Sequence, residues 1–157
     1  MKVSRNWLKT FFDTPLPDAQ ALADALTFHA FEIESTEQIG HPMSNFVLDV
    51  KVTANRGHDC LSHRGIAREL SAILNIPMKS DPLALRFNLN NSTLRLNLNV
   101  SIENPKLCAR YIAGYIRGVK VGPSPDWLRE HLESIGQKSI NNIVDATNFV
   151  MFNIGQH

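Results

Sequence analysis

Two segments of the chain, one in each half, alternate apolar and polar residues. Residues 46–52 place apolar side chains at every second position, so these side chains would share one face of an extended strand. Residues 94–103 alternate almost perfectly, which is typical of a strand that buries one face and exposes the other. Residues 32–35 and 110–121 are also expected to be strands. The fold must therefore contain a sheet.

Other segments carry their apolar residues at helical spacing. They predict helices that follow Ser4, Asp18, Asp59, Ser124 and Asn141. Ser4, Asp59 and Ser124 are the expected N-cap residues, because short polar side chains there can accept a hydrogen bond from the first turn. Strands and helices together predict an α+β fold.

Composition bounds the class of protein. The chain has 157 residues, of which 43% are hydrophobic and 20% are charged, as in ordinary globular domains. Sixteen Lys and Arg residues against fifteen Asp and Glu residues give a net charge of +1. This excludes a basic arm or an acidic tail, although a local basic patch can hide within a neutral total. No stretch reaches the ~20 apolar residues of a membrane span, so a cytoplasmic protein is expected.

The familiar signatures of enzyme active sites are missing from the sequence. It contains neither a glycine-rich phosphate loop nor a G-x-S-x-G nucleophile motif. The two cysteines cannot form a four-thiolate metal site, and the six histidines are scattered. We expect these histidines to be surface or capping residues. The residues by themselves therefore predict no catalytic residue and no metal site.

The densest polar cluster spans residues 55–59 and reads Asn-Arg-Gly-His-Asp. Arg56 could hold a phosphate at the start of the following helix. Alternatively, Arg56 forms a salt bridge while its neighbours make a turn and a helix cap, and this second interpretation is favoured. Arg64 and Arg68 lie on the next helix and could face RNA or simply solvent.

A second polar group lies within an otherwise apolar helix near the end of the sequence. Asp145, Thr147 and Asn148 need hydrogen-bond partners if that helix is buried. The hydroxyl and amide could orient a water molecule or bind an amino-acid head group. Equally, Asp145 and Asn148 could bind neighbouring loops and hold the helix in place.

Several segments resemble the N-terminal part of the bacterial phenylalanyl-tRNA synthetase beta subunit. The resemblance covers residues 1–9, 22–34, 50–70, 125–128 and 139–150, in the family's order. Residues 53–56 read Thr-Ala-Asn-Arg, where the family has a T-P-N-R core. Residues 65–69 read Gly-Ile-Ala-Arg-Glu, as in the family's G-I-A-R-E motif. The segment at 139–150 is the most specific.

The sequence also departs from the family pattern. The family usually inserts an oligonucleotide-binding barrel before the strand at 46–52. Here Glu34 and Phe46 are only twelve positions apart, so this barrel is absent. Ala54 replaces the family's proline, and His157 stands where another proline is expected. Because the family's beta subunit is several times longer, we expect this chain to be a fragment of one.

The resemblance implies a fold and an activity. Residues 1–85 would form a small helix-and-sheet domain, and residues 86–157 the incomplete start of the α/β editing module. The whole enzyme would charge tRNA with phenylalanine using ATP and magnesium, as a heterotetramer of two alpha and two beta chains. The alpha chain would hold the aminoacylation site, and the complete beta chain would hydrolyse mischarged tyrosyl-tRNA.

The resemblance also assigns roles to residues. Thr147 and Asn148 would lie in the editing pocket. Because the net charge is only +1 and the barrel is absent, we expect weak tRNA binding, with Arg56, Arg64 and Arg68 as the candidates for contact with tRNA or a partner. Lys106 and Arg110 are weaker candidates for tRNA contact. We expect no ligase activity and no bound ATP or magnesium in the fragment alone. The alternative is a free-standing tRNA-binding or trans-editing module without ligase activity.

Overall fold

The computed structural model describes residues 1–40, 45–79, 81–84 and 99–155. Contacts divide the chain into two compact units, Met1–Leu85 with Val121–His157, and Arg86–Lys120. All helices and strands of the described residues belong to the first unit. Residues 86–157, expected as one module, contribute to both units. The expected domain boundary after residue 85, between a small N-terminal domain and the editing module of a longer subunit, stays a prediction.

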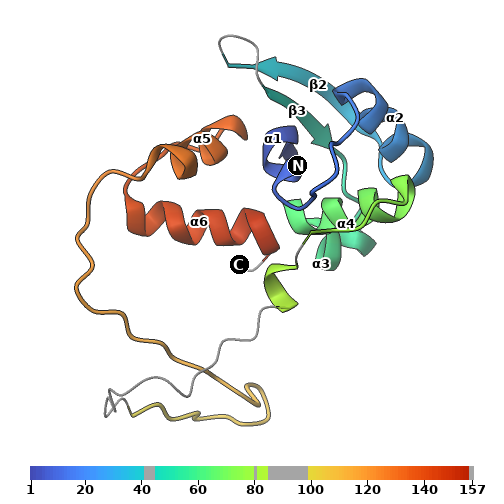
Figure 1. Ribbon diagram of the computed structural model, residues 1–157. Helices are drawn as coiled ribbons and strands as arrows, with labels where there is room; N and C mark the ends of the chain where they lie inside the picture. The colour runs from blue at the N-terminus through green and yellow to red at the C-terminus, as the bar shows by residue number, and fades with distance from the viewer. Residues whose placement is uncertain (41–44, 80, 85–98, 156–157) are drawn as a thin grey trace. The chain divides into compact units, whose positions relative to one another are not determined.

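A three-stranded antiparallel sheet organises the first unit (Figure 1). Its strands are β1 (Lys2–Ser4), β2 (Ile33–Ile39) and β3 (Asn45–Val50), in the order β1-β3-β2. The central strand β3 is the most buried, and its apolar side chains at 47, 48 and 50 are at most 2% exposed. The strands expected at 32–35 and 46–52 are confirmed. Strand β2 pairs directly with β3, and only residues 40–44 connect them, which is too short for an inserted barrel.

Two helices pack beside this sheet. Helix α1 (Arg5–Lys9) begins at Ser4, whose hydroxyl accepts a hydrogen bond from the Trp7 amide. Helix α2 (Ala19–His29) begins at Asp18, whose carboxylate accepts from the Ala21 amide. Both predicted starts are confirmed, because the capping side chain and its backbone donor are close in sequence. Trp7 and the leucines of both helices form much of the core.

The helix expected after Asp59 is divided in two. The short 3-10 turn η1 (Ala54–Arg56) leads into α3 (Gly57–Cys60), and α4 (His63–Leu74) follows after a break. Ser62 caps α4 by accepting from the Gly65 amide. Asp59 as N-cap was therefore wrong, because its carboxylate binds Arg56 instead. The short 3-10 turn η2 (Pro82–Ala84) follows α4.

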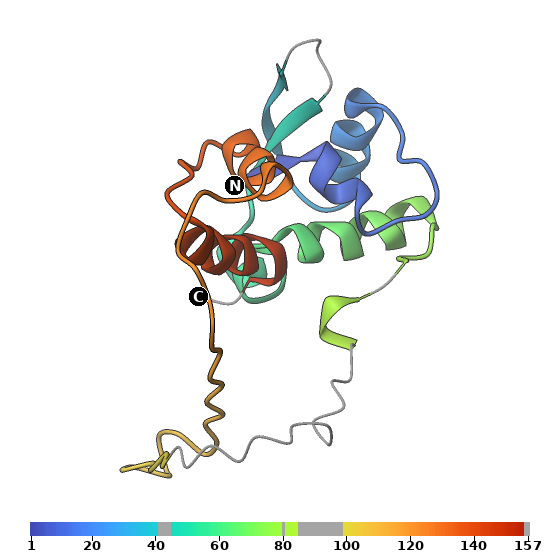
Figure 2. The ribbon, with the colours of Figure 1, turned by 60° about the vertical axis from the view of Figure 1, so that its left-hand side comes forward.

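Helices α5 (Asp126–Ser134) and α6 (Asn142–Ile154) lie side by side in both views (Figures 1 and 2). Leu128 and Leu132 of α5 join the core, and α6 also packs against α4. Asn141 caps α6, as its predicted start requires. Ser124 as the N-cap of α5 was wrong, because its hydroxyl donates to Asp145. None of the described helices is both long and apolar enough to cross a bilayer.

The two strands expected in the second half of the chain, at 94–103 and 110–121, are not formed by its described residues. Residues 94–98 lie outside the described residues, and residues 99–120 contain neither helix nor strand. The strand expected at 110–121 is therefore wrong, and so is the described part of the one at 94–103. A strand needs a neighbour to accept its backbone hydrogen bonds, and none of the described strands pairs with this region. Its apolar side chains are accordingly exposed, Ile112 by 72% and Ile116 by 81%.

Candidate functional site

Helix α6 carries the predicted pocket residues and is anchored at its start by Asp145. This carboxylate is fully buried and accepts from the Ser124 and Ser139 hydroxyls and the Ile140 amide. The hydrogen bonds from Ser124, and then from Ser139, hold the pKa of Asp145 below its ordinary value. The structural interpretation of Asp145 is confirmed, since it ties α6 to the segments that precede α5 and α6.

The second half of α6 is held by an aromatic stack centred on Trp7. The indole lies between His63 and Phe149, with ring centroids 3.9 Å and 4.9 Å away and rings nearly parallel to both. Its Nε1–H donates to Asn153 Oδ1 at 2.9 Å. The stack therefore joins α1, α4 and α6 through one buried side chain.

His63 is the buried polar centre of this stack. Its Nε2 accepts from the Ser4 amide at 3.1 Å, so Nδ1 carries the proton and donates to the Phe152 carbonyl at 3.0 Å. Burial lowers the pKa of His63 to about 3. The expectation of a surface or capping histidine was wrong here. His63 precedes Ile66, Ala67 and Leu70 at helical spacing, and this apolar stripe was the available signal.

We expect the unit to lose stability as the pH falls below 6.5, the ordinary pKa of histidine. Between pH 6.5 and about 3 the unfolded chain binds a proton at His63 that the folded chain does not. The free energy of unfolding should therefore fall by about 1.4 kcal/mol per pH unit. Urea denaturation at pH 6.5 and about pH 4.5 measures this, before carboxylates with depressed pKa values, such as Asp145, begin to contribute.

The control for this pH dependence is His63→Gln, which removes the titrating group. Its unfolding free energy should change little over the same range. A wild-type stability that stays flat between these two pH values would contradict the assignment.

Thr147 lies on α6 away from the stack, whereas Asn148 is half-buried and lies one turn from both Asp145 and Phe152. The residues that face the stack and core are Asp145, Phe149, Phe152 and Asn153. Thr147 is exposed and donates its hydroxyl hydrogen to the Val144 carbonyl of its own helix at 2.7 Å. Ile143 and Val150, one turn away on either side, are also exposed. The anchors thus hold α6 by one face and leave the face with Thr147 open, while a pocket there stays a prediction.

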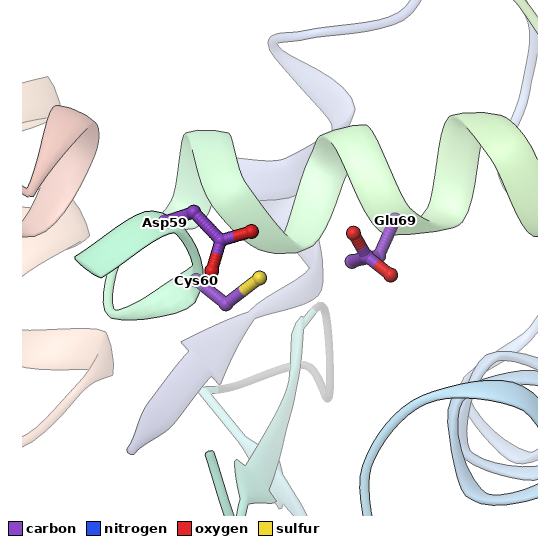
Figure 3. Close-up of side chains that lie close together, drawn as sticks. All are labelled: Asp59, Cys60 and Glu69. Atoms are coloured by element: carbon purple, nitrogen blue, oxygen red, sulfur yellow. The ribbon is translucent and has the colours of Figure 1, made fainter. Parts of the chain in front are cut away.

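Asp59, Cys60 and Glu69 form the cluster that most resembles a metal site (Figure 3). Their ligand atoms lie within 4.8 Å of one another, with Glu69 on α4 facing the end of α3. The Arg56 guanidinium already occupies this cluster. It donates to Asp59 at 2.8 Å, to Glu69 at 2.7 Å and to the Cys60 sulfur at 3.2 Å. The salt-bridge interpretation of Arg56 is confirmed.

The pKa values in this cluster follow from the same arrangement. Hydrogen bonding to Arg56 lowers the pKa of Asp59 to about 2. Burial raises the pKa of the Cys60 thiol to about 12, so this sulfur stays protonated. A protonated thiol is a poor metal ligand and a poor nucleophile. The cluster thus binds an internal guanidinium and does not fit a divalent cation.

The other two arginines of the predicted contact surface differ from each other. Arg64 on α4 makes a two-point ion pair with Asp81, and this pairing raises the pKa of Arg64 and lowers that of Asp81. Arg68, one turn later, is exposed. Arg68 is therefore the best placed of the three predicted contact residues to meet an external anion.

A cleft of about 480 Å³ opens between α1, the ends of β2 and β3, and α5. It is lined by Asn6, Ile39, Gly40, Asn45, Glu130, Glu133 and Ser134. Its charged groups are two carboxylates, so it does not suit a phosphate.

Comparisons with known proteins find several that are similar to this chain in sequence. A protein from Rhodopirellula baltica is 40% identical over 99% of this chain, and the match spans 22% of that protein. One from Bdellovibrio bacteriovorus is 49% identical over 69% of this chain and 13% of its own length. One from Dehalococcoides mccartyi is 44% identical over 73% of this chain and 14% of its own length. All three are named phenylalanine–tRNA ligase beta subunit. The chain is a relative of these beta subunits.

The resemblance inferred from the motifs is thereby confirmed. The chain spans about a fifth of the Rhodopirellula beta subunit and less of the other two. Residues 107–157 also match the B3/4 domain family. These matches favour part of a beta subunit over a free-standing binding or editing module.

The match to the B3/4 domain family includes only some of the predicted site residues. Thr147 and Asn148 fall inside the B3/4 match, whereas Arg56, Arg64 and Arg68 precede it. The alignment with the Rhodopirellula beta subunit is 156 residues long and covers nearly the whole chain. It leaves no room for a long insertion, so that relative also lacks one at the β2–β3 connection.

Proposed function

We propose that the chain is the N-terminal part of a phenylalanine–tRNA ligase beta subunit. The observation that carries this proposal is the 40% identity to the Rhodopirellula beta subunit over 99% of the chain. The whole enzyme would join phenylalanine to tRNA in the cytoplasm, as a heterotetramer of two alpha and two beta chains. When complete, the beta chain would also hydrolyse mischarged tyrosyl-tRNA.

In this proposal ATP and magnesium belong to the alpha chain. The cluster of Asp59, Cys60 and Glu69 does not fit Mg²⁺, because Arg56 already neutralises its carboxylates and its thiol is protonated. The role of the described residues is instead structural. They hold α6 through Asp145 and Trp7, so that Thr147 on its opposite face and Asn148 on its flank would line an editing pocket.

A chimeric enzyme tests the proposed function. This chain would replace the matching part of the Rhodopirellula beta subunit, produced together with that organism's alpha subunit. We expect the chimera to charge tRNA with phenylalanine, and the chain alone to show no pyrophosphate exchange. The proposal fails if the chimera assembles with the alpha subunit but does not charge tRNA, although the parent enzyme does.

In the same chimera, Thr147→Ala should change the relative hydrolysis of tyrosyl- and phenylalanyl-tRNA by about tenfold, because the loss of one hydrogen bond to the substrate costs about 1.4 kcal/mol. The chain's unfolding free energy should change by less than about 1 kcal/mol, because the side chain is exposed. Deacylation of both charged tRNAs and urea denaturation measure the two effects.

Thr27→Ala is the matched control, since Thr27 is an exposed threonine on α2. It should leave the hydrolysis ratio unchanged. Equal ratios in wild type and Thr147→Ala would show that Thr147 has only a structural role.

A further inference from the structure

Helix α6 is attached near both of its ends, and Thr147 lies between the two points of attachment. Asp145 holds the first turns through the hydrogen bonds that it accepts from the preceding segments. Contacts with α1 and α4, which begin at Phe149, hold the last turns. Because only about one helical turn separates Asp145 from Phe149, the position of Thr147 follows from these two attachments.

His63 joins the start of α1 to the end of α6. Its ring accepts from the amide of Ser4, the N-cap residue of α1, and donates to the Phe152 carbonyl in the last turn of α6. The last four carbonyls of a helix have no partner within that helix, and this hydrogen bond satisfies one of them from α4. The end of α6 points toward α4 (Figure 1), and a single imidazole ties it to α1.

Trp7 fixes the rotation of α6 about its own axis. Its indole lies nearly parallel to the Phe149 ring, with 4.9 Å between the centroids, and its Nε1–H donates to Asn153 Oδ1 at 2.9 Å. Phe149 and Asn153 are one turn apart and therefore share one face of the helix. Thr147 precedes Phe149 by about 200° around the helix, so a rotation that moved Thr147 would break both contacts with Trp7.

We propose that Trp7 and His63 are positioning residues for the hydrolysis of mischarged tyrosyl-tRNA, and that they act through α6 on Thr147. The inference rests on the proposed function for the pocket and its reaction, and it extends the control of that pocket to α1 and α4. A misplacement of about 1 Å can lower the rate of an enzyme reaction about 100-fold. Small changes at the attachment of α6 should therefore alter hydrolysis before they unfold the chain.

The test uses the chimeric enzyme, with hydrolysis of tyrosyl-tRNA measured over a range of substrate concentrations. Trp7→Phe keeps an aromatic ring and removes the donor to Asn153. We expect kcat for hydrolysis to fall about tenfold, because Thr147 is displaced from the reacting geometry. KM and the rate of charging with phenylalanine should each change less than about twofold, whereas a loss of folded enzyme would lower hydrolysis and charging together.

Asn153 supplies the conservative variants. Asn153→Leu removes the acceptor for Trp7 and should also lower kcat about tenfold, whereas Asn153→Asp keeps an acceptor oxygen and should retain most of the rate. Trp7→Phe combined with Asn153→Leu should cost no more than either change alone, because both remove the same hydrogen bond. Trp127→Phe is the matched control. Trp127 is an exposed indole that meets Phe149 edge-on, and its replacement should leave kcat unchanged.

Hydrogen exchange in the chain by itself gives a measurement that needs no enzyme activity. Trp7→Phe should speed amide exchange in the last turns of α6 at least about tenfold more than in the first turns, which Asp145 holds. His63→Leu removes both hydrogen bonds of the imidazole and should have the same local effect. An equal increase throughout α6 would show a general loss of stability and would contradict the proposal.

The chimera separates this inference from the proposed function. If it charges tRNA and hydrolyses tyrosyl-tRNA, but Trp7→Phe and Asn153→Leu leave kcat unchanged or lower charging by the same factor, the inference alone is overturned. A chimera that hydrolyses tyrosyl-tRNA without charging tRNA would overturn the proposed charging function alone. A chimera that assembles and hydrolyses no tyrosyl-tRNA would overturn the editing pocket, and this inference with it.

Discussion

Replacing Trp7 with alanine is expected to lower the free energy of unfolding by about 3–5 kcal/mol. The side chain is only 1% exposed and stacks on both His63 and Phe149. Its removal leaves a cavity between α1, α4 and α6 and also deletes the hydrogen bond to Asn153. Urea denaturation followed by circular dichroism measures the change.

Trp7→Phe is the control for this variant. A phenyl ring keeps an aromatic surface between His63 and Phe149 but loses the donor to Asn153, so we expect a loss of about 1–2 kcal/mol. A loss below about 1 kcal/mol for Trp7→Ala would contradict the central place of this stack, because buried aromatic deletions cost several times more.

Gly65→Ala should destabilise the chain by about 3 kcal/mol, because the new methyl group meets backbone that cannot move aside. A Cβ at this position would lie 2.1 Å from the Asp59 carbonyl oxygen and 2.7 Å from the Cys60 Cα. Relief of this overlap requires α3 and α4 to separate, which would also pull Asp59 and Glu69 apart around Arg56. Thermal and urea denaturation measure the effect.

Gly57→Ala is the matched control. Gly57 has helical backbone angles, and its Cβ would meet only the flexible Leu61 side chain at 3.4 Å. Alanine is the better helix former, so this variant should be neutral or more stable by up to about 1 kcal/mol. If Gly65→Ala behaves like Gly57→Ala, the close approach of α3 and α4 is not a packing constraint.

The helices were predictable from the sequence wherever their signals are local. Ser4 caps a helix as expected, and the helices expected to start at Asp18 and Asn141 do so, because each of these three side chains binds an amide within three residues of itself. Asp59 and Ser124 have the same capping chemistry and do not cap. Each has a stronger partner, Arg56 in one case and the buried Asp145 in the other.

The strands were less predictable, because a strand also needs a partner that is distant in sequence. The alternation in residues 46–52 predicted β3 correctly, and the chain supplies β1 and β2 on either side of it. The alternation in residues 94–103 is as suggestive, yet its described part, residues 99–103, pairs with no described strand. A pattern of side chains shows which face of a strand could be buried, but it carries no information about whether a neighbouring strand is present.

The sequence predicted the salt bridge of Arg56, but it did not predict the buried contacts of His63 that help to hold α6. The Arg56 salt bridge was expected, since its acidic partner Asp59 is only three positions away. The role of His63 was missed, because its partners Ser4 and Phe152 are 59 and 89 positions away. Such contacts arise from tertiary packing and leave only a weak trace in the sequence, here a histidine on an apolar helix stripe.

The hydrogen bond between Trp7 and Asn153 joins residues 146 positions apart, which sets an order of events during synthesis. A ribosome adds about 5–20 residues per second, so the indole emerges roughly 7–30 s before its partner. Throughout that interval the nascent chain displays an uncovered indole and an imidazole that lacks the Phe152 carbonyl. Completion of the N-terminal core therefore waits for translation of α6.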